Sequence, residues 1–154
     1  MPIPQPRIEL LRTHLSDNDY KIYGILSQYI DVVWRNAKPF IQNALKYGDN
    51  KYTLDSVKKA LISRDMQLWL IYLNANIKGI VVTEIIQYPN KKYLTIVLLS
   101  GVEFDAWAYH WSTIKEWAIG EGCEAVQVFG RPGWERKLKT LGFEKIHTVL
   151  RLDF

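Results

Sequence analysis

Three runs of strand-forming residues follow one another in the middle of the chain, and they constrain the fold more than any other feature of the sequence. The runs are 67–73 (QLWLIYL), 77–86 (IKGIVVTEII) and 93–99 (YLTIVLL). The connections 74–76 (NAN) and 88–90 (YPN) have the composition of tight turns. Strands joined by such short turns predict an antiparallel meander. The last run is almost wholly apolar, which indicates a central strand buried on both faces.

Helical periodicity precedes the meander. Apolar residues at spacings of three and four predict a helix that starts near residue 18, and Pro39 is expected to break or restart it. Gly48 ends this region, and Thr53 is the expected cap of a second helix. A short apolar run at 8–11 is a candidate first strand.

The clearest helical period in the chain follows the meander. Asp105 is its expected cap and Gly120 its expected end, and Trp107 and Trp111 share one face. These two tryptophans have two interpretations. They pack on the sheet as part of the core, or they form an aromatic wall for a ligand or an anchor for a partner.

The rest of the chain alternates strands with a helix. A strand is expected at 125–129, a short basic helix at 134–141 and a last strand at 143–152. The helical connection from 93–99 to 125–129 predicts a parallel, right-handed crossover. The sequence therefore predicts a single α/β (α+β) domain over residues 1–154, with a central mixed sheet and helices on both faces.

Composition excludes several classes of protein. The 154 residues are 48% hydrophobic and 23% charged, which fits a globular domain rather than a disordered or fibrous chain. A single cysteine excludes an internal disulfide, and His14, His110 and His147 lack the spacing of metal ligands, so no metal is expected. The sequence has neither a spanning apolar run nor a signal peptide. We therefore expect a soluble, cytoplasmic protein with no membrane partner.

The order helix, helix, three-strand meander, helix, strand, short helix, strand resembles the GNAT N-acetyltransferase fold over nearly the whole chain. Residues 130–152 (GRPGWERKLKTLGFEKIHTVLRL) are similar to the end of GNAT proteins, where Leu-Gly-Phe follows a short helix; here 141–143 hold those places. Residues 48–70 (GDNKYTLDSVKKALISRDMQLWL) and 77–85 (IKGIVVTEI) resemble small GNAT-like proteins encoded by tailed phages. The resemblance implies a location in the host cytoplasm or the virion.

The resemblance also implies a loop for the pyrophosphate of acetyl-CoA after the fourth strand of the fold. GNAT enzymes carry Arg/Gln-x-x-Gly-x-Gly/Ala there, because bare backbone amides at a helix N-terminus bind anions. This chain has SGVEFD at 100–105, with one glycine, no arginine and two carboxylates. If the loop holds acetyl-CoA, Ser100 and Gly101 are its candidate contacts. The alternative is an acidic helix cap in which Glu103 and Asp105 satisfy the helix dipole.

Catalysis in the family implies two further groups. The first is a tyrosine general acid four residues before the glycine of Leu-Gly-Phe, and Leu138 occupies that place. The second is a base on or near the fourth strand, but 93–99 carries no carboxylate. Glu84, on the neighbouring strand, is the candidate catalytic base, with a raised pKa if it has this role. Its alternative is a solvent-facing residue paired with a lysine.

A basic turn is the best anion site in the sequence. The turn at 130–133 (GRPG) opens the short basic helix, so that its amides and Arg131 could hold a phosphate of CoA or of a nucleotide. Arg131 and Gly133 are therefore further candidate cofactor contacts. The alternative is a solvated basic face.

These observations support three functions. The first is a GNAT-fold protein with a degenerate cofactor loop, which needs no cofactor and has a non-catalytic binding or virion-assembly role. Its partner is another protein or a second copy, bound through an aromatic surface. The second is an active N-acetyltransferase that moves an acetyl group from acetyl-CoA to an amine. The third, a nucleic-acid-binding module, is allowed by a net charge of +4, but 20 basic against 16 acidic residues do not require it.

Overall fold

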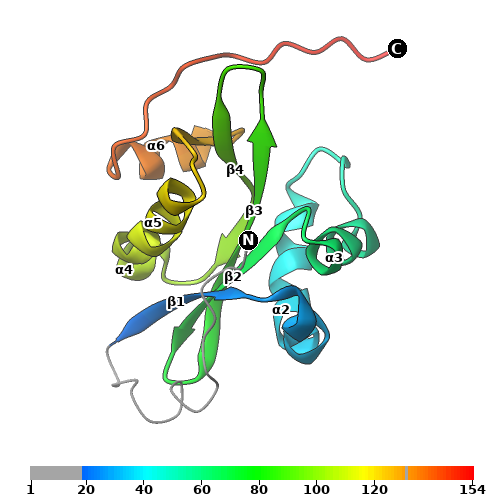
Figure 1. Cartoon of the computed structure of the whole chain (residues 1–154), viewed down its shortest axis with the longest axis vertical. Helices are drawn as coiled ribbons and strands as arrows, with labels where there is room; N and C mark the ends of the chain where they lie inside the picture. The colour runs from blue at the N-terminus through cyan, green and yellow to red at the C-terminus, as the bar shows by residue number, and fades with distance from the viewer. Residues whose placement is uncertain (1–18, 131) are drawn as a thin grey trace.

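A five-stranded sheet forms the centre of the computed structural model, which describes residues 19–130 and 132–154 (Figure 1). The strand order follows the sequence, β1-β2-β3-β4-β5. The first four strands are antiparallel neighbours, and β5 joins β4 in parallel. The antiparallel meander of β2, β3 and β4 and the parallel pairing of β5 are as predicted. The strands are β1 (Tyr20–Ile25), β2 (Gln67–Leu73), β3 (Asn76–Gln87), β4 (Lys92–Gly101) and β5 (Ala125–Val128).

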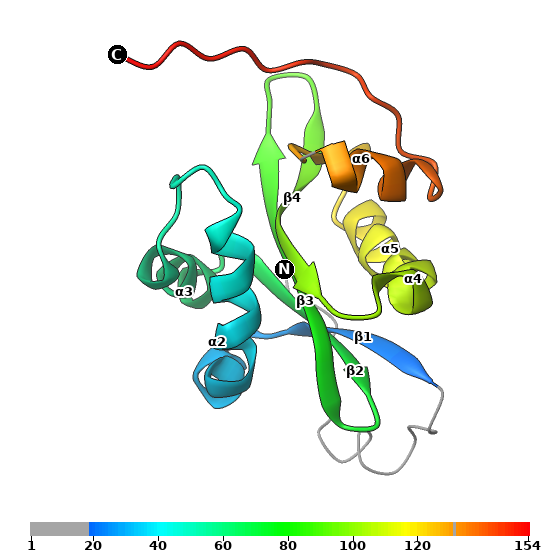
Figure 2. The ribbon, with the colours of Figure 1, turned by 180° about the vertical axis from the view of Figure 1, so that it is seen from behind.

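Helices cover both faces of this sheet, as the two opposite views in Figures 1 and 2 show. One face carries α2 (Ile30–Lys46) and α3 (Leu54–Ser63). The other carries α4 (Phe104–Trp107), α5 (Ser112–Gly120) and α6 (Pro132–Lys139). The predicted mixed α/β (α+β) architecture is therefore confirmed. No helix within the described ranges has both the length and the apolar character that crossing a membrane requires.

The alternation of side chains along β2 divides the core into two apolar layers. Leu68 and Leu70 belong to the layer under α2 and α3, whereas Trp69 and Ile71 belong to the layer under α4 and α5. All four side chains are fully buried. The hydrophobic effect therefore fixes the helices on both faces through one central strand.

The two tryptophans that share a helical face have different surroundings. Trp107 is fully buried in the layer under α4 and α5, together with Ile114 and Ala118, so its core interpretation is confirmed. Trp111 ends a short 3-10 turn (η2, Ala108–Trp111) and is only half-buried, against Phe143 at 5.2 Å between ring centroids. The core interpretation of Trp111 holds in part, because its side chain stays half exposed although it lines the same small apolar cavity as Trp107 and Ile114.

The start of the described chain departs from the sequence prediction. The helix expected from residue 18 is strand β1 up to Ile25, followed by a 3-10 turn (η1, Ser27–Tyr29), and α2 begins only at Ile30. The spacing of the apolar residues fits both periods, and pairing decides between them, because Ile22 lies opposite Ile71 of β2. The candidate strand at 8–11 lies outside the described residues.

Pro39 does not break α2, contrary to prediction. Its ring lies on the exposed side of the helix, and the fully buried Ala37 and Ile41 anchor the turns on either side of it. Packing of these turns therefore offsets the hydrogen bond that proline removes.

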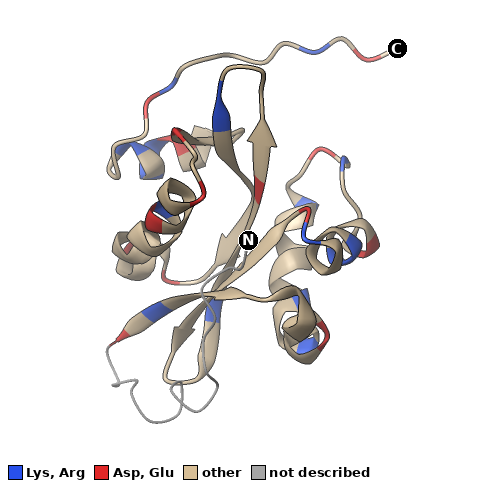
Figure 3. Ribbon diagram, viewed as in Figure 1, with Lys and Arg blue, Asp and Glu red and all other residues tan. Residues whose placement is uncertain are grey.

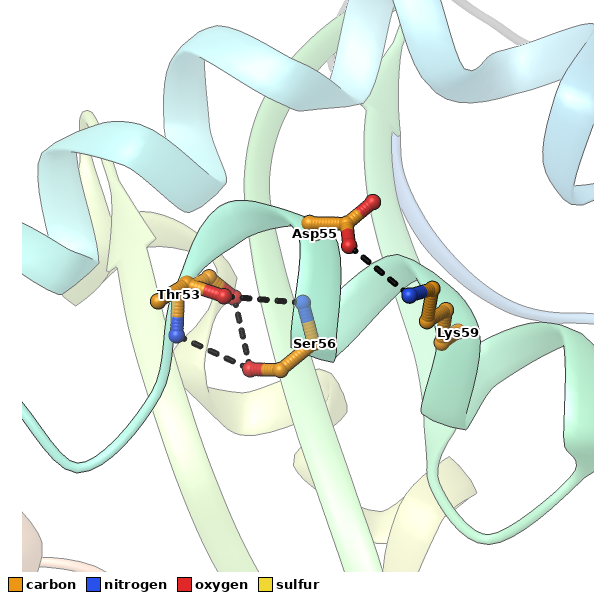
Figure 4. Close-up of polar contacts among 4 residues, drawn as sticks. All are labelled: Thr53, Asp55, Ser56 and Lys59. Atoms are coloured by element: carbon orange, nitrogen blue, oxygen red, sulfur yellow. Dashed lines mark hydrogen bonds and ion pairs between the residues drawn. The ribbon is translucent and has the colours of Figure 1, made fainter.

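The predicted cap of α3 is confirmed and is a reciprocal capping box (Figure 4). The Thr53 hydroxyl accepts a hydrogen bond from the Ser56 amide at 3.0 Å, and the Ser56 hydroxyl accepts one from the Thr53 amide at 2.8 Å. One turn further, Lys59 pairs with Asp55 at 3.1 Å. The two hydrogen bonds of the capping box satisfy amides that a helix N-terminus leaves unpaired, and they fix where the loop from α2 to α3 ends.

The last strand, predicted at 143–152, does not form. Gly142, with φ of 95°, turns the chain after α6, and the residues that follow run past the end of the β3–β4 hairpin without joining the sheet (Figures 1 and 2). An extended segment becomes a strand only when its main chain has a partner, and this one has none among the described residues.

Candidate functional site

β5 pairs with only the first half of β4. Their parallel pairing runs from Tyr93 opposite Ala125 to Ile96 opposite Val128, and β4 then continues to Gly101 with β3 as its only partner strand among the described residues. β5 ends at Val128, and the chain turns into α6. We call the region between residues 97–101 of β4 and α6 the wedge.

A β-bulge lies where the wedge begins. Val82 of β3 faces Leu98, but the next residue, Thr83, faces Ile96, so that Val97 is an extra residue in β4. A bulge bends its strand and changes the direction of nearby main-chain groups. The described part of β5 has no residue paired with β4 beyond Ile96, so this edge of β4 is available for other contacts.

Ser100 and Gly101, two candidate cofactor contacts, lie at the end of β4 beside the wedge. Ser100 is buried, and its hydroxyl accepts a hydrogen bond from the Asn43 side chain of α2 at 3.0 Å. A Cβ on Gly101 would lie 2.6 Å from the Gly79 Cα and 2.6 Å from the Lys78 carbonyl oxygen. Glycine here therefore lets β3 and β4 approach each other, which gives it a structural role in the sheet.

Glu103 ties the loop between β4 and α4 to the sheet. It precedes α4 in the left-handed conformation, with φ of 58°. Its carboxylate accepts a hydrogen bond from the Tyr20 hydroxyl of β1, and Lys78 of β3 lies 3.8 Å from it. The hydrogen bond raises the pKa of Tyr20. Glu103 thus belongs to the loop at 100–105 that the family resemblance assigns to the pyrophosphate, and its carboxylate is already held by two side chains of the sheet.

Two contacts bridge α4 and α6 across the wedge. The rings of Phe104 and Trp134 meet edge to face, with centroids 5.0 Å apart. The Lys137 ammonium lies 3.9 Å from an Asp105 carboxylate oxygen and 5.2 Å from the centre of the Phe104 ring. We call these contacts the α4–α6 bridge. Behind it, the Trp107 indole donates to the Val102 carbonyl oxygen at 2.8 Å and fixes the loop.

The place implied for a general acid is apolar. Leu138 is buried in the same layer as Phe104 and Trp107. It lines a cavity of about 30 Å³ whose described lining residues are all aliphatic or aromatic, including Ile96 and Leu99 of β4. Side chains therefore fill this part of the wedge, and none of those lining residues carries an acidic proton.

Glu84, the candidate base, lies on β3 opposite Thr95 of β4. It is half-buried, and its pKa is raised, first by burial and then by the negative charge of Asp65. The ion pairs found among the described residues do not include it, so the lysine partner of the alternative interpretation is not seen. Thr95 precedes Ser100 by five residues, about 17 Å along a strand, so the structure does not bring Glu84 to the cofactor loop.

The basic turn is described only in part, since Arg131 lies outside the described residues. Gly133 lies in the first turn of α6, exposed, and a Cβ there would meet no atom within 4 Å. Two lysines of α6 have acidic partners: Lys137 pairs with Asp105, and Lys139 lies 3.8 Å from Glu135.

Solved structures with a similar arrangement of helices and strands include acetyltransferases. Aminoglycoside N-acetyltransferase AAC(6')-Iy in complex with CoA is 13% identical over 88% of this chain and 95% of that chain, with a TM-score of 0.66. Ribosomal-protein-alanine N-acetyltransferase from Brucella melitensis biovar Abortus 2308 is 14% identical over 88% and 99% of the two chains, with a TM-score of 0.64. Aminoglycoside acetyltransferase meta-AAC0020, from an uncultured soil metagenomic sample, is 14% identical over 89% of this chain and 99% of that chain, with a TM-score of 0.60. No family model and no curated protein matches the sequence.

The chain has the GNAT fold. Sequence identities of 13–14% to these structures establish the fold of the chain alone. Its function has to be argued from the site. The bulge in β4 and the early end of its pairing with β5 are present, whereas the loop after β4 is acidic and the α4–α6 bridge crosses the wedge.

A hollow of about 670 Å³ is a feature that the sequence analysis missed. It lies where β1 ends and β2 begins, and its polar lining includes Arg64, Asp65 and Gln67. Beside it the Gln67 side chain accepts a hydrogen bond from the Thr83 hydroxyl at 2.8 Å. No sequence signal marks this hollow, because its walls come from separate segments of the chain.

Cys123 and the described histidines do not build a reactive centre. Cys123 is buried, and burial raises the pKa of its thiol, which disfavours the nucleophilic thiolate. Within residues 19–130 and 132–154, no three or more His, Cys, Asp or Glu side chains lie together as metal ligands.

Proposed function

We propose that this GNAT-fold protein binds a partner and does not transfer an acetyl group. The observation that carries the proposal is the α4–α6 bridge, in which Phe104 meets Trp134 and Asp105 pairs with Lys137. It occupies the approach to the loop that would hold the pyrophosphate of acetyl-CoA. The residues at this place therefore do not fit the cofactor.

Electrostatics supports the same conclusion. A diphosphate at this loop would lie beside Glu103 and Asp105. Two like unit charges 4 Å apart repel by about 4 kcal/mol at an effective dielectric constant near 20. Lys78 and Lys137 lie 3.8 Å and 3.9 Å from these carboxylates and offset part of this repulsion, but a diphosphate could use either lysine only in competition with its present carboxylate partner.

Calorimetric titration with acetyl-CoA tests the proposal. We expect a dissociation constant above about 1 mM, which corresponds to a binding free energy weaker than about −4 kcal/mol. The variant E103G/D105G should improve any residual binding, because it removes two negative charges and releases Lys78 and Lys137. Arg131→Ala should weaken residual binding if the turn at 130–133 supplies a phosphate contact.

A matched variant separates charge from shape. E103Q/D105N removes both charges and keeps the side-chain size, so a gain equal to that of E103G/D105G would assign the block to electrostatics. Micromolar affinity of the unmodified protein for acetyl-CoA would contradict the proposal.

An active N-acetyltransferase is the second candidate, and the bulge at Val97 together with the early end of the β4–β5 pairing favours it. The neighbour AAC(6')-Iy, whose structure contains CoA, supports acetyl-CoA as the donor under this alternative. Glu84 would be its base, and the cofactor contacts would be Ser100, Gly101, Arg131 and Gly133. Release of CoA thiol from acetyl-CoA in the presence of varied amines, lost in Glu84→Gln, would establish this function.

Nucleic-acid binding, the third candidate, gains no support from the charge distribution. Basic and acidic residues are interspersed over both helical layers in Figure 3. Several lysines are paired with carboxylates, including Lys58 with Asp31 at 3.2 Å. A nucleic-acid interface needs unpaired cations gathered on one face.

The setting that we propose for the binding role is phage assembly, and it rests on the resemblance of residues 48–70 and 77–85. The side chains that a protein partner would cover include the exposed aromatics Tyr47, Tyr109 and Phe129. Mass spectrometry of purified particles and assembly intermediates tests this setting. Absence of the protein from both would contradict it.

A further inference from the structure

The hollow between the end of β1 and the start of β2 has a volume of about 670 Å³, within the range of small-molecule sites. It lies at the end of β1 that is remote from the loop at 100–105. Tyr20, at the start of β1, holds Glu103 of that loop, whereas Ile25, at the end of β1, lines the hollow. The length of this six-residue strand, about 17 Å, separates the two places. The hollow is therefore distinct from the place implied for acetyl-CoA.

Gln67 presents a hydrogen-bond donor to the hollow. Its side chain is buried, with 8% of its surface exposed, and a chain of hydrogen bonds fixes its orientation. The Trp69 indole donates to the Thr83 hydroxyl at 3.0 Å, and this hydroxyl donates its own proton to the Gln67 amide oxygen at 2.8 Å. The amide nitrogen therefore points the other way, and it has no hydrogen-bond partner among the described residues. A buried amide group with two unused donors indicates an acceptor group in a ligand.

Arg64 places a positive charge beside the same donor. It precedes Gln67 by three residues, in the short connection between α3 and β2. Its Nε donates to the Ser27 hydroxyl at 3.2 Å, which holds the guanidinium at the hollow. The ion pairs found among residues 19–130 and 132–154 do not include Arg64. A guanidinium and an amide nitrogen that converge from one segment match the two oxygens of a carboxylate.

The other wall of the hollow carries a negative charge. Glu121 follows α5, which covers the sheet face opposite to α3 (Figures 1 and 2). Its side chain is half-buried and belongs to none of the ion pairs just described, although the Lys92 ammonium reaches its main-chain carbonyl oxygen at 2.5 Å. Trp117, one helical turn earlier, lines the hollow with its ring. A carboxylate beside an indole ring suits an ammonium group.

The charges of the lining select among classes of ligand. A polyanion would meet the carboxylates of Asp65 and Glu121, and a polyamine would meet the guanidinium of Arg64. A zwitterion meets neither obstacle, because it places each charge on the opposite wall. Between these walls the lining is apolar and includes Leu61 and Ile85. This surface suits an aliphatic or aromatic side chain.

We propose that the hollow binds a free α-amino acid with a bulky apolar side chain. The carboxylate of the ligand accepts hydrogen bonds from Arg64 and Gln67, and its ammonium group lies between Glu121 and the ring of Trp117. The site gives the protein a small-molecule ligand in addition to the partner that we propose for it. It does not depend on whether acetyl-CoA binds.

Isothermal titration calorimetry with L-leucine, L-phenylalanine and L-methionine tests the proposal. We expect saturable binding of at least one of them, with one ligand per chain and a dissociation constant below about 1 mM. Two derivatives of that amino acid divide its charges: the N-acetyl form lacks the ammonium group, and the amide form lacks the carboxylate. Each derivative should bind at least about tenfold more weakly, because it leaves one charged wall without a partner.

Two variants assign the two walls. Arg64→Gln should weaken binding of the amino acid but not of its amide form, which has no carboxylate to lose. Glu121→Gln should weaken binding of the amino acid but not of its N-acetyl form. The matched controls are Arg35→Gln and Glu124→Gln, which remove the same charges from exposed positions outside the described lining. A general disturbance of the fold would weaken all ligands alike, so the pattern separates binding from structural effects.

Circular dichroism confirms that each variant is folded, and either wall variant serves if the other does not fold. Three results would overturn the proposal. The first is the absence of saturable binding of all three amino acids at millimolar concentration. The second is equal affinity for the amino acid and both derivatives. The third is binding to the wall variants that matches binding to their controls.

Discussion

Phe104 of α4 and Trp134 of α6 meet edge to face with their ring centroids 5.0 Å apart, beside the part of β4 that has no pairing with β5. The contact joins two helices that the chain reaches 30 residues apart. It makes the wedge part of the apolar core, since Phe104 is buried and Trp134 packs against the same layer.

A double-mutant cycle measures this contact. We expect Phe104→Leu and Trp134→Leu to couple by about 0.5–1.5 kcal/mol, the range of aromatic pairs beyond simple burial. The free energy of unfolding in urea is the quantity to measure for both single variants and the double variant. Strict additivity would mean that the two helices are not joined through these rings.

The two tryptophans of the α4–η2 region should differ in their contributions to stability. Trp107→Ala should cost about 3–5 kcal/mol, because the side chain is fully buried. Trp111→Ala should cost less, since it is half-buried and its ring contact is with Phe143. Trp107→Phe removes the hydrogen bond to Val102, worth about 1 kcal/mol, together with part of the buried ring, and should cost less than Trp107→Ala. Equal losses in the two alanine variants would show that Trp111 is also a core residue.

Gly101 should prove structural rather than ligand-binding. Gly101→Ala should destabilise the protein by about 1–3 kcal/mol, because its Cβ would overlap Gly79 and the Lys78 carbonyl. Gly120→Ala, at a helical position with no atom within 4 Å, is the control and should be neutral or stabilising by about 0.4–1 kcal/mol. Chemical denaturation of both variants checks this, and a stable Gly101→Ala protein would return Gly101 to the candidate cofactor contacts.

Glu84 should make stability fall as pH rises. Its pKa is raised in the folded protein by burial and by Asp65, so the folded state binds the proton more tightly than the unfolded chain. The protonated form is therefore favoured on folding, and stability is lost between the unfolded pKa, about 4.3, and the raised folded pKa. Glu84→Gln should stabilise the protein at neutral pH and have no effect at low pH.

Thermal unfolding across this pH range measures the effect. Asp65→Asn is a second variant, and it should stabilise the protein at neutral pH by less than Glu84→Gln does. A Glu84→Gln protein that is less stable than the parent at neutral pH would mean that the carboxylate makes a favourable contact in its ionised form.

The candidate site was predictable in its residue types but not in its contacts. The sequence placed Glu103 and Asp105 in the loop after β4 and Leu138 at the position of the general acid. It could not show that Tyr20, Lys78 and Lys137 hold those carboxylates, because each partner comes from a distant segment. The hollow beside Gln67 was invisible for the same reason.

The sequence by itself determined the meander of β2, β3 and β4, the cap at Thr53 and the helical end at Gly142, because short turns, capping side chains and glycine act within a few residues. Only the tertiary structure decided that 20–25 is a strand, that Pro39 stays inside α2, and that 143–152 remains unpaired. In each of these three cases the local pattern fits more than one conformation. The free energy that selects among them comes from burial against, or hydrogen bonding to, residues far away in the chain.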